Sequence, residues 1–203
     1  RYETVRVQSD FPKENRPIYV RPVVAMTAKN KEVGYPAMVK GVKEVVESHP
    51  TERVLVHCVS YELGRVLASG LVPLPGRSVL TYGPGERDSV VESFKALERS
   101  VLIAPSLERG VDLPDDLCRV QVIAKIPFPY LGDRQISARL HSPGGQGWYT
   151  VSTVRSIVQS TGRGVRHKED WAISYILDST FVSNVWGRNR GLFPTWWREA
   201  LIW

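Results

Sequence analysis

The sequence predicts an α/β fold in which a mainly parallel β-sheet is sandwiched between layers of helices. Short apolar segments alternate along the chain with segments whose apolar residues recur at helical spacing. Several apolar segments, such as residues 54–59 and 120–126, are apolar nearly throughout, which is typical of strands buried on both faces of a parallel sheet. Strands of this kind that alternate with amphipathic helices indicate a sheet covered on both sides.

The expected elements follow from this periodicity and from the residues that end each segment. Apolar residues recur at helical spacing after Tyr35 until His49 and Pro50 end the run. We expect helices at residues 35–49, 61–71, 88–99, 133–141, 148–160 and 196–201, with Asp88 as an N-cap. We expect strands at residues 18–20, 23–26, 54–59, 77–82, 101–104, 120–126 and 171–177.

The chain has 203 residues, of which 42% are hydrophobic and 24% charged, an ordinary globular composition. No internal repeat or low-complexity tract divides it. Prolines at positions 12, 17 and 22 bias the residues before them to extended backbone. We therefore expect one domain at residues 35–203 with an aromatic-rich C-terminal tail, and an extended segment at residues 1–34 packed on it.

The charge and the cysteines narrow the class of protein. An excess of basic residues, 27 Lys and Arg against 21 Asp and Glu, favours polyanion partners, although many basic proteins bind no nucleic acid. Cys58 and Cys118 form no CxxC pair, so neither a zinc nor an iron–sulfur site is indicated. Two cysteines fit the reducing interior of a cell, and no apolar run approaches the ~20 residues of a membrane span. We expect a cytoplasmic location, or the nucleoid or nucleus.

Two common kinds of catalytic site are missing from the sequence. Neither GxxxxGK[ST] nor a GxGxxG that follows a strand occurs, so no phosphate loop is present. The glycine-rich residues 144–147 carry no lysine and are predicted to be a flexible loop. No GxSxG occurs, and the four histidines have no local partner pattern for a Ser-His-Asp site.

The most informative string is QxxGRxxR, formed by residues 159–166. Phosphoryl transfer accumulates negative charge on oxygens, and the planar guanidinium of arginine can bind two oxygens at once. Arg163 and Arg166, three residues apart on a predicted helix end, would project on one face. Gly162 lets the backbone turn, and Gln159 can hydrogen-bond a nucleotide. The alternative is a basic cap on a solvated helix end.

Three further groups follow predicted strands. Gly110 and Asp112 follow the strand at 101–104, where Asp112 could bind a ribose hydroxyl or an arginine of the QxxGRxxR string. Ser60 and Tyr61 stand at the end of the strand at 54–59 and suit a phosphate contact and a base stack. Phe128 and Tyr130 follow the strand at 120–126 and are candidates for stacking, with core packing as the alternative.

This ordered set resembles the C-terminal helicase domain of the XPD/DinG family in superfamily 2, which has a RecA-like fold. Ser60 and Tyr61 look like motif IV, residues 106–113 like motif V and residues 159–166 like motif VI. Residues 11–16, 125–129 and 192–197 also look like family segments, so the resemblance covers nearly the whole chain. Arg109 departs from the pattern, because the family has a glutamate directly before the motif V glycine and Glu108 here lies one residue earlier.

The resemblance implies one half of an ATP-driven motor that moves single-stranded DNA in the 5′–3′ direction. The first RecA-like domain of the same polypeptide would hold ATP and Mg²⁺, and in some members an iron–sulfur cluster. The second would supply Arg163 and Arg166 as arginine fingers, with Gln159, Gly162, Gly110 and Asp112 lining the nucleotide cleft and Ser60, Tyr61, Phe128 and Tyr130 contacting DNA. The chain alone is then expected not to hydrolyse ATP.

Two other functions remain as alternatives. A non-catalytic nucleic-acid-binding module could keep the fold, although it would not need the Arg163 and Arg166 spacing. A small-molecule α/β enzyme would need a phosphate loop or a triad. Ordinary packing is expected for the tryptophans at positions 148, 171, 186, 196, 197 and 203, and solvated charge for Arg188 and Arg190.

Overall fold

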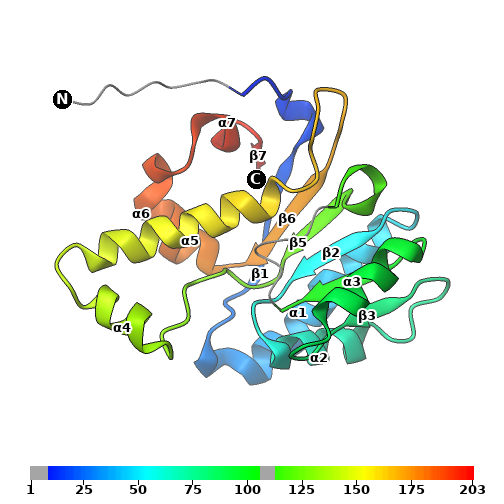
Figure 1. Cartoon of the computed structure of the whole chain (residues 1–203), viewed down its shortest axis with the longest axis horizontal. Helices are drawn as coiled ribbons and strands as arrows, with labels where there is room; N and C mark the ends of the chain where they lie inside the picture. Colours follow the sequence, from blue (N-terminus) through cyan, green and yellow to red (C-terminus); the bar gives the residue numbers. More distant parts are fainter. Residues whose placement is uncertain (1–8, 106–112) are drawn as a thin grey trace.

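A single seven-stranded sheet forms the centre of the computed structural model, which describes residues 9–105 and 113–203. The strand order is β3-β4-β2-β5-β6-β1-β7, and every neighbouring pair is parallel (Figure 1). The predicted α/β fold with a parallel sheet between helices is therefore confirmed.

The strands and helices have the following bounds. The strands are β1 (Ile18–Val24), β2 (Val54–His57), β3 (Val79–Thr81), β4 (Val101–Ala104), β5 (Val120–Ile123), β6 (Ile173–Asp178) and β7 (Leu201–Ile202). The α-helices are α1 (Lys31–Ser48), α2 (Tyr61–Leu71), α3 (Arg87–Ala96), α4 (Arg134–Leu140), α5 (Gly145–Thr161), α6 (Gly187–Asn189) and α7 (Thr195–Arg198). A π-helical segment, Phe181–Trp186, follows β6, and short 3-10 turns occupy Lys13–Asn15, Ala28–Asn30, Asp115–Leu117 and Arg190–Leu192.

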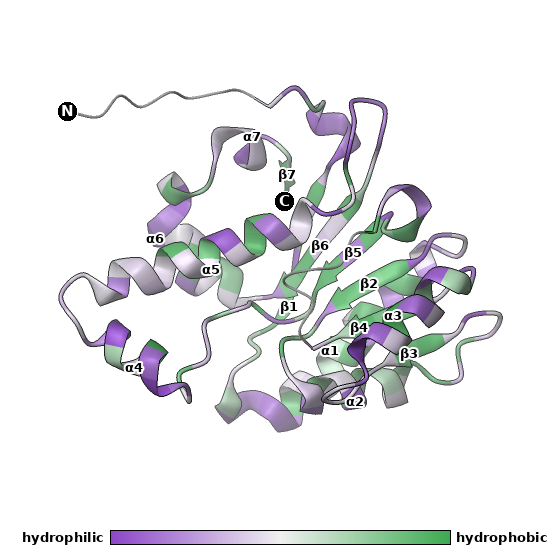
Figure 2. Ribbon diagram, in the orientation of Figure 1, coloured by the Kyte–Doolittle hydropathy of each residue, from purple (hydrophilic) through white to green (hydrophobic). Residues whose placement is uncertain are grey.

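Successive side chains of the central strands point to opposite faces of the sheet. In β2, Val54 and Val56 pack with α1 and α2, whereas Leu55 packs with α3. On the face that Leu55 shares, α5, the π-helical segment and α7 cover β1, β5 and β6. Figure 2 shows largely green strands between helices in which green and purple segments alternate. Burial on both sides explains why the central strands are mainly apolar and why their few polar residues, such as Gln121 and Ser174, are buried.

Several predicted boundaries are wrong, each for a local reason. The two strands expected at 18–20 and 23–26 are one strand, β1, whose register with β6 shifts between Val20 and Val24. Pro22, which has no N–H to donate, lies in that shift. Helix α1 begins at Lys31 rather than at residue 35 and contains Pro36. The expected N-cap Asp88 lies inside α3, which begins at Arg87.

The glycine-rich and C-terminal segments also differ from prediction. Residues 145–147 are the first turn of α5 rather than a loop, and only Gly144 stays outside, with a left-handed φ of 76°. The expected helix at 196–201 is shorter, since α7 ends at Arg198 and Leu201 belongs to β7, beside β1. The tail thus adds an edge strand to the sheet.

One buried carboxylate organises the carboxyl edge of the sheet. Asp178, at the end of β6, accepts hydrogen bonds from the backbone N–H groups of Met26, Ile126 and Thr180. These bonds join the chain segments that leave β1, β5 and β6, so the loops at this edge start from fixed positions. Among the described residues, none of the helices has both the length and the apolar character to cross a lipid bilayer.

Candidate nucleotide and nucleic-acid interface

The QxxGRxxR string lies at the end of α5 and in the loop that follows. Helix α5 ends at Thr161 with Gly162 as its C-cap, and residues 162–172, here called the arginine loop, lead to β6. Arg163 and Arg166 therefore lie in this loop and not on a helix end, so the predicted helical face is wrong. Gln159 is exposed on the last turn of α5, Arg163 is half-buried and Arg166 is exposed.

A buried aspartate holds the arginine loop in place. The Oδ2 atom of Asp170 accepts a hydrogen bond of 2.8 Å from the backbone N–H of Arg166. Its Oδ1 atom accepts from the backbone N–H of Trp171 and from the guanidinium of Arg119, which precedes β5. Burial acts to raise the pKa of Asp170, but the hydrogen bonds from Arg119 and Arg166 outweigh it, and the pKa is lowered. The carboxylate thus stays charged and ties the loop to the sheet.

Gly164 brings the arginine loop into direct contact with the strand layer. A Cβ atom at this position would lie 2.3 Å from the Cβ of Ala172 and 2.4 Å from the carbonyl oxygen of Cys118. Neither atom can move away easily, because one belongs to the backbone and the other is a Cβ. Only glycine therefore fits at position 164, directly after Arg163.

Arg163 lies close enough to two buried groups of the strand layer to act on them electrostatically. Its positive charge acts both on His57, at the end of β2, and on Cys118, just before β5. His57 is only 5% exposed, and its Nε2 atom makes no hydrogen bond of good geometry with any described residue. Burial first and the charge of Arg163 second lower the pKa of His57 to about 4, with Gln121 acting in the opposite direction. His57 is therefore neutral at physiological pH.

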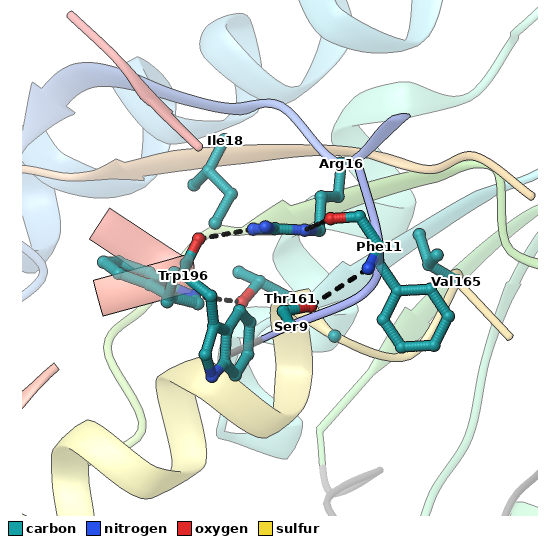
Figure 3. A pocket seen from close by; sticks show the side chains of 9 residues that line it. Ser9, Phe11, Arg16, Ile18, Thr161, Val165 and Trp196 are labelled. Carbon is teal, nitrogen blue, oxygen red and sulfur yellow. Dashed lines mark hydrogen bonds between the residues drawn. The ribbon is translucent and has the colours of Figure 1, made fainter. Parts of the chain in front are cut away.

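The C-terminal tail and the N-terminal segment meet at the same end of α5. The Nε1 atom of Trp197 donates a hydrogen bond of 2.7 Å to the Oγ1 atom of Thr161, in a fully buried contact. Beside it lies a cavity of about 370 Å³ with a mainly apolar lining (Figure 3). Arg16 crosses this cavity and donates hydrogen bonds to the carbonyl oxygens of Phe11 and Trp196. Both flanks of the domain thus brace the end of α5.

Ser60 and Tyr61 lie at the carboxyl edge of the sheet, where β2 ends. This edge is opposite the one at which the arginine loop enters β6. The Oγ atom of Ser60 accepts a hydrogen bond from the backbone N–H of Leu63 and caps α2, while Tyr61 is 37% exposed. Val59, the residue before Ser60, has a φ of 62°. A β-branched residue in this region is strained, and such strain is concentrated at functional sites.

Phe128 and Tyr130 follow β5, the hydrogen-bonded neighbour of β2, and the two differ in exposure. The ring of Phe128 stacks on Tyr149 of α5 with centroids 6.1 Å apart, which is packing within the domain. Tyr130 is 76% exposed and its ring lies against Gly132. Of the two, Tyr130 has a ring that a base could reach.

The other predicted groups fall into three sets. Gly110 and Asp112 lie outside the described residues. Arg188 and Arg190 are exposed. Among the tryptophans, Trp197 is buried, Trp148, Trp186 and Trp196 are partly buried, and Trp171 and Trp203 are 38% and 62% exposed.

A metal site does not fit the described residues near the arginine loop. The side chains of Asp115, His167 and Asp170 lie close enough together to share an ion. Both oxygens of Asp170 are already hydrogen-bonded to Arg119, Arg166 and Trp171, so the strongest ligand of the three is engaged. The groups gathered at this end of α5 instead suit an anion, since they are an amide, Gln159, and two guanidinium groups.

Comparison with known proteins decides the family. Residues 42–200 match the family described as the helicase C-terminal domain. The chain belongs to this family.

Helicase C-terminal domains of the XPD/DinG type resemble this one in both sequence and structure. The ATP-dependent helicase DinG of Mycobacterium tuberculosis is 31% identical over 130 residues, which are 60% of this chain and 20% of that protein. The ATP-dependent DNA helicase YoaA of Haemophilus influenzae is 28% identical over 142 residues, 66% of this chain and 22% of that protein. The structure of Xpd4 from S. tokodaii aligns with a TM-score of 0.68 at 19% identity, covering 98% of this chain and 40% of that one.

These comparisons confirm the predicted XPD/DinG-type helicase C-terminal domain and its RecA-like fold. This helicase C-terminal domain spans about a fifth of the length of the curated relatives DinG and YoaA.

Several residues of the site were not predicted from the sequence. Local sequence patterns assign no role to Asp170, Arg119 or His57, and they include Thr161 only as a member of the QxxGRxxR string. Their partners lie far along the chain: the contact from Arg119 to Asp170 spans 51 residues and that from Trp197 to Thr161 spans 36. The available signal was an acidic pair, Glu169 and Asp170, shortly before a strand, which is too common to identify a site.

Proposed function

We propose that this helicase C-terminal domain is the second motor domain of an ATP-dependent 5′–3′ DNA helicase. In this role it supplies Arg163 and Arg166 as arginine fingers to ATP whose phosphates and Mg²⁺ are held mainly by the first motor domain. Gln159 and Gly162 line the same cleft, together with Gly110 and Asp112. The observation that carries the proposal is the arginine loop, which gathers an exposed amide and two guanidinium groups at one end of α5.

The construction of the loop supports a role in charge stabilisation. Preorganised cations that face developing negative charge lower the barrier to phosphoryl transfer because they need no reorganisation during the reaction. Asp170 binds the backbone N–H of Arg166 and leaves the side chain of Arg166 exposed. Gly164 packs against the strand layer and fixes the loop between Arg163 and Arg166. The loop is thus held by its backbone while Arg166 faces outward.

Single-stranded DNA would lie along the carboxyl edge of the sheet. Ser60, Tyr61 and Tyr130 follow the neighbouring strands β2 and β5 and lie at this edge, whereas Phe128 is largely engaged with Tyr149. Closure of the two motor domains on nucleotide and opening after hydrolysis would move DNA along this edge in steps. The domain alone is expected not to hydrolyse ATP, because it contains no phosphate loop. An iron–sulfur cluster, if the enzyme has one, would lie outside this chain.

The decisive experiment is the ATPase activity of the helicase that carries this domain joined to its first motor domain, with single-stranded DNA present. We expect Arg163→Ala and Arg166→Ala each to lower the turnover number by roughly 10³-fold while nucleotide still binds. Arg87→Ala, which removes a partly exposed arginine of α3 that pairs with Asp88, is the matched control and should retain activity.

Two outcomes would contradict the proposal. Normal hydrolysis in both loop variants would show that these arginines do not act on the phosphates. An unmodified helicase that hydrolyses no ATP with DNA or RNA, but still binds them, would favour the alternative of a non-catalytic nucleic-acid-binding module.

A further inference from the structure

The positive charge of the chain is concentrated in one continuous segment. Residues 134–168 contain five arginines, one lysine and no aspartate or glutamate. The remainder of the chain has 21 basic and 21 acidic residues, so this segment accounts for the whole formal net charge of +6. It comprises α4, α5 and the first part of the arginine loop. A segment without any acidic residue cannot neutralise its own arginines.

Helix α4 projects from the domain and buries little of its surface. None of its residues is buried, and Arg134 and Arg139 are exposed. In Figure 1 α4 lies away from the sheet, with the start of α5 as its neighbour, and in Figure 2 it is largely purple. An element with so little apolar contact contributes little to the core, which points to a role for its surface.

The junction of α4 and α5 is nevertheless well defined. A Cβ atom at Gly145 would lie 2.1 Å from the carbonyl oxygen of Arg139, so the first turn of α5 packs directly against the end of α4. The guanidinium of Arg139 lies 4.2 Å from the ring centroid of Trp148 in a cation–π contact. Trp148 is thus a positioning residue that holds Arg139 on the surface shared by the two helices.

The exposed side of α5 continues this surface to the C-terminal end of the helix, where the arginine loop begins. Trp148, Arg155 and Gln159 lie seven and then four residues apart, a spacing that places them on one helix face. The opposite face carries the buried Val154 and Ile157. The outward face of α5 therefore joins the α4 arginines to Gln159, with Arg155 exposed between them.

We propose that Arg134, Arg139 and Arg155 form a binding surface for the phosphate backbone of single-stranded nucleic acid. This surface, here called the α4–α5 basic face, lies outside the three motif-like strings. Tyr130, which is 76% exposed and lies four residues before Arg134, borders the surface and offers a ring for base stacking. The inference rests on the proposed DNA role and extends it from the carboxyl edge of the sheet to this pair of helices.

The chemistry of the face favours nucleic acid over a protein partner. Helices α4 and α5 carry three exposed arginines and no acidic residue, with Asp133 only capping the start of α4, and an exposed aromatic ring lies beside them; these groups match the backbone and the bases of a single strand. A protein interface would be expected to have an apolar centre, whereas the exposed side of α5 is polar apart from the partly buried Trp148.

The test measures binding of this chain to a labelled oligothymidine of about 16 nucleotides by fluorescence anisotropy, without ATP, at about 50 to 200 mM salt. The variant R134Q/R139Q/R155Q should bind roughly tenfold more weakly, and the slope of log affinity against log salt should fall by about 2. The variant R134K/R139K/R155K keeps the charges and should retain most of the affinity. Circular dichroism and thermal melting check that each variant is folded.

The matched control is K29Q/K40Q/K43Q, which removes the same charge from exposed positions in and just before α1, on the opposite face of the sheet. It should change affinity by less than about twofold, since it lies beyond the screening length. Unchanged affinity and slope in the arginine variant would overturn the inference and leave the ATPase assignment of Arg163 and Arg166 intact. If the unmodified chain binds no oligonucleotide, both the basic face and the DNA role fail, whatever the ATPase result.

Discussion

Two aspartates bind the same arginine in this domain, yet only one of them is buried. Asp170 is fully buried and contacts Arg119 and the arginine loop, whereas Asp116, 2.9 Å from the same guanidinium, is 85% exposed. We expect Asp170→Asn to lower the free energy of unfolding by about 3 kcal/mol, because it breaks a buried pair. Asp116→Asn should cost less than about 1 kcal/mol. Chemical denaturation of both variants provides the measurement, and equal losses would contradict this account.

Gly164 gives a second prediction for the arginine loop. Gly164→Ala places a methyl group against Ala172 and the carbonyl oxygen of Cys118, so we expect a loss of about 1 to 3 kcal/mol in stability and a fall in ATPase activity of the joined helicase. Gly147 is the control, since it lies in the first turn of α5 with no atom within 4 Å of an added Cβ. Gly147→Ala should be neutral or stabilising by up to about 1 kcal/mol. A Gly164→Ala variant as stable as the wild type would show that the loop can move.

Some residues of the site can be predicted from local sequence patterns, and others cannot. Gln159, Arg163 and Arg166 were selected from one local string, and the structure places that string at one end of α5. The roles of Asp170 and Arg119 depend on a contact between residues 51 positions apart, which no local pattern encodes. Local spacing therefore identified the chemical groups, and only the fold could show what holds them.

At the scale of elements, the prediction succeeded where burial sets the pattern. The bounds of α2 and β4 agree with the structure at both ends, since a capping serine begins α2 and a fully apolar run forms β4. The predicted bounds are wrong at the glycine-rich residues 144–147 and at the C-terminal tail, because contacts with other elements determine the structure of these two segments. The carbonyl of Arg139 packs on Gly145, and β1 pairs with Leu201.

The tail element makes a testable contribution to the end of α5. Trp197→Phe keeps an aromatic ring but removes the hydrogen bond to Thr161, so we expect a loss of about 1 to 3 kcal/mol in unfolding free energy. Trp203→Phe is the control, because Trp203 is 62% exposed and should change stability by less than about 0.5 kcal/mol. Thermal melting distinguishes the two. Equal melting temperatures for both variants would show that the tail does not brace α5.

At the scale of the whole molecule, the family match covers residues 42–200, whereas the sheet includes β1 near the N-terminus. β1 lies between β6 and β7, so the N-terminal segment contributes a strand to the sheet rather than only packing against it. The prolines at positions 17 and 22 indicated extended backbone but could not show where that strand would pair. Parallel neighbours are distant in sequence, and the order β5-β6-β1-β7 therefore lies outside what local patterns predict.

The stability of the whole domain should depend on pH through His57. Burial and Arg163 lower its pKa from 6.5 to about 4, so the unfolded chain takes up a proton more readily than the folded one. The stabilisation is complete above pH 6.5 and is lost progressively as the pH falls to about 4, which corresponds to about 3 kcal/mol. Burial lowers the pKa of His49 as well, and this adds a further loss of stability as the pH falls.

In urea titrations between these pH values, His57→Gln should show a much smaller loss of stability than the wild type. His141→Gln, at an exposed position, should keep the wild-type slope. An unchanged slope in His57→Gln would mean that the imidazole is not buried in its neutral form.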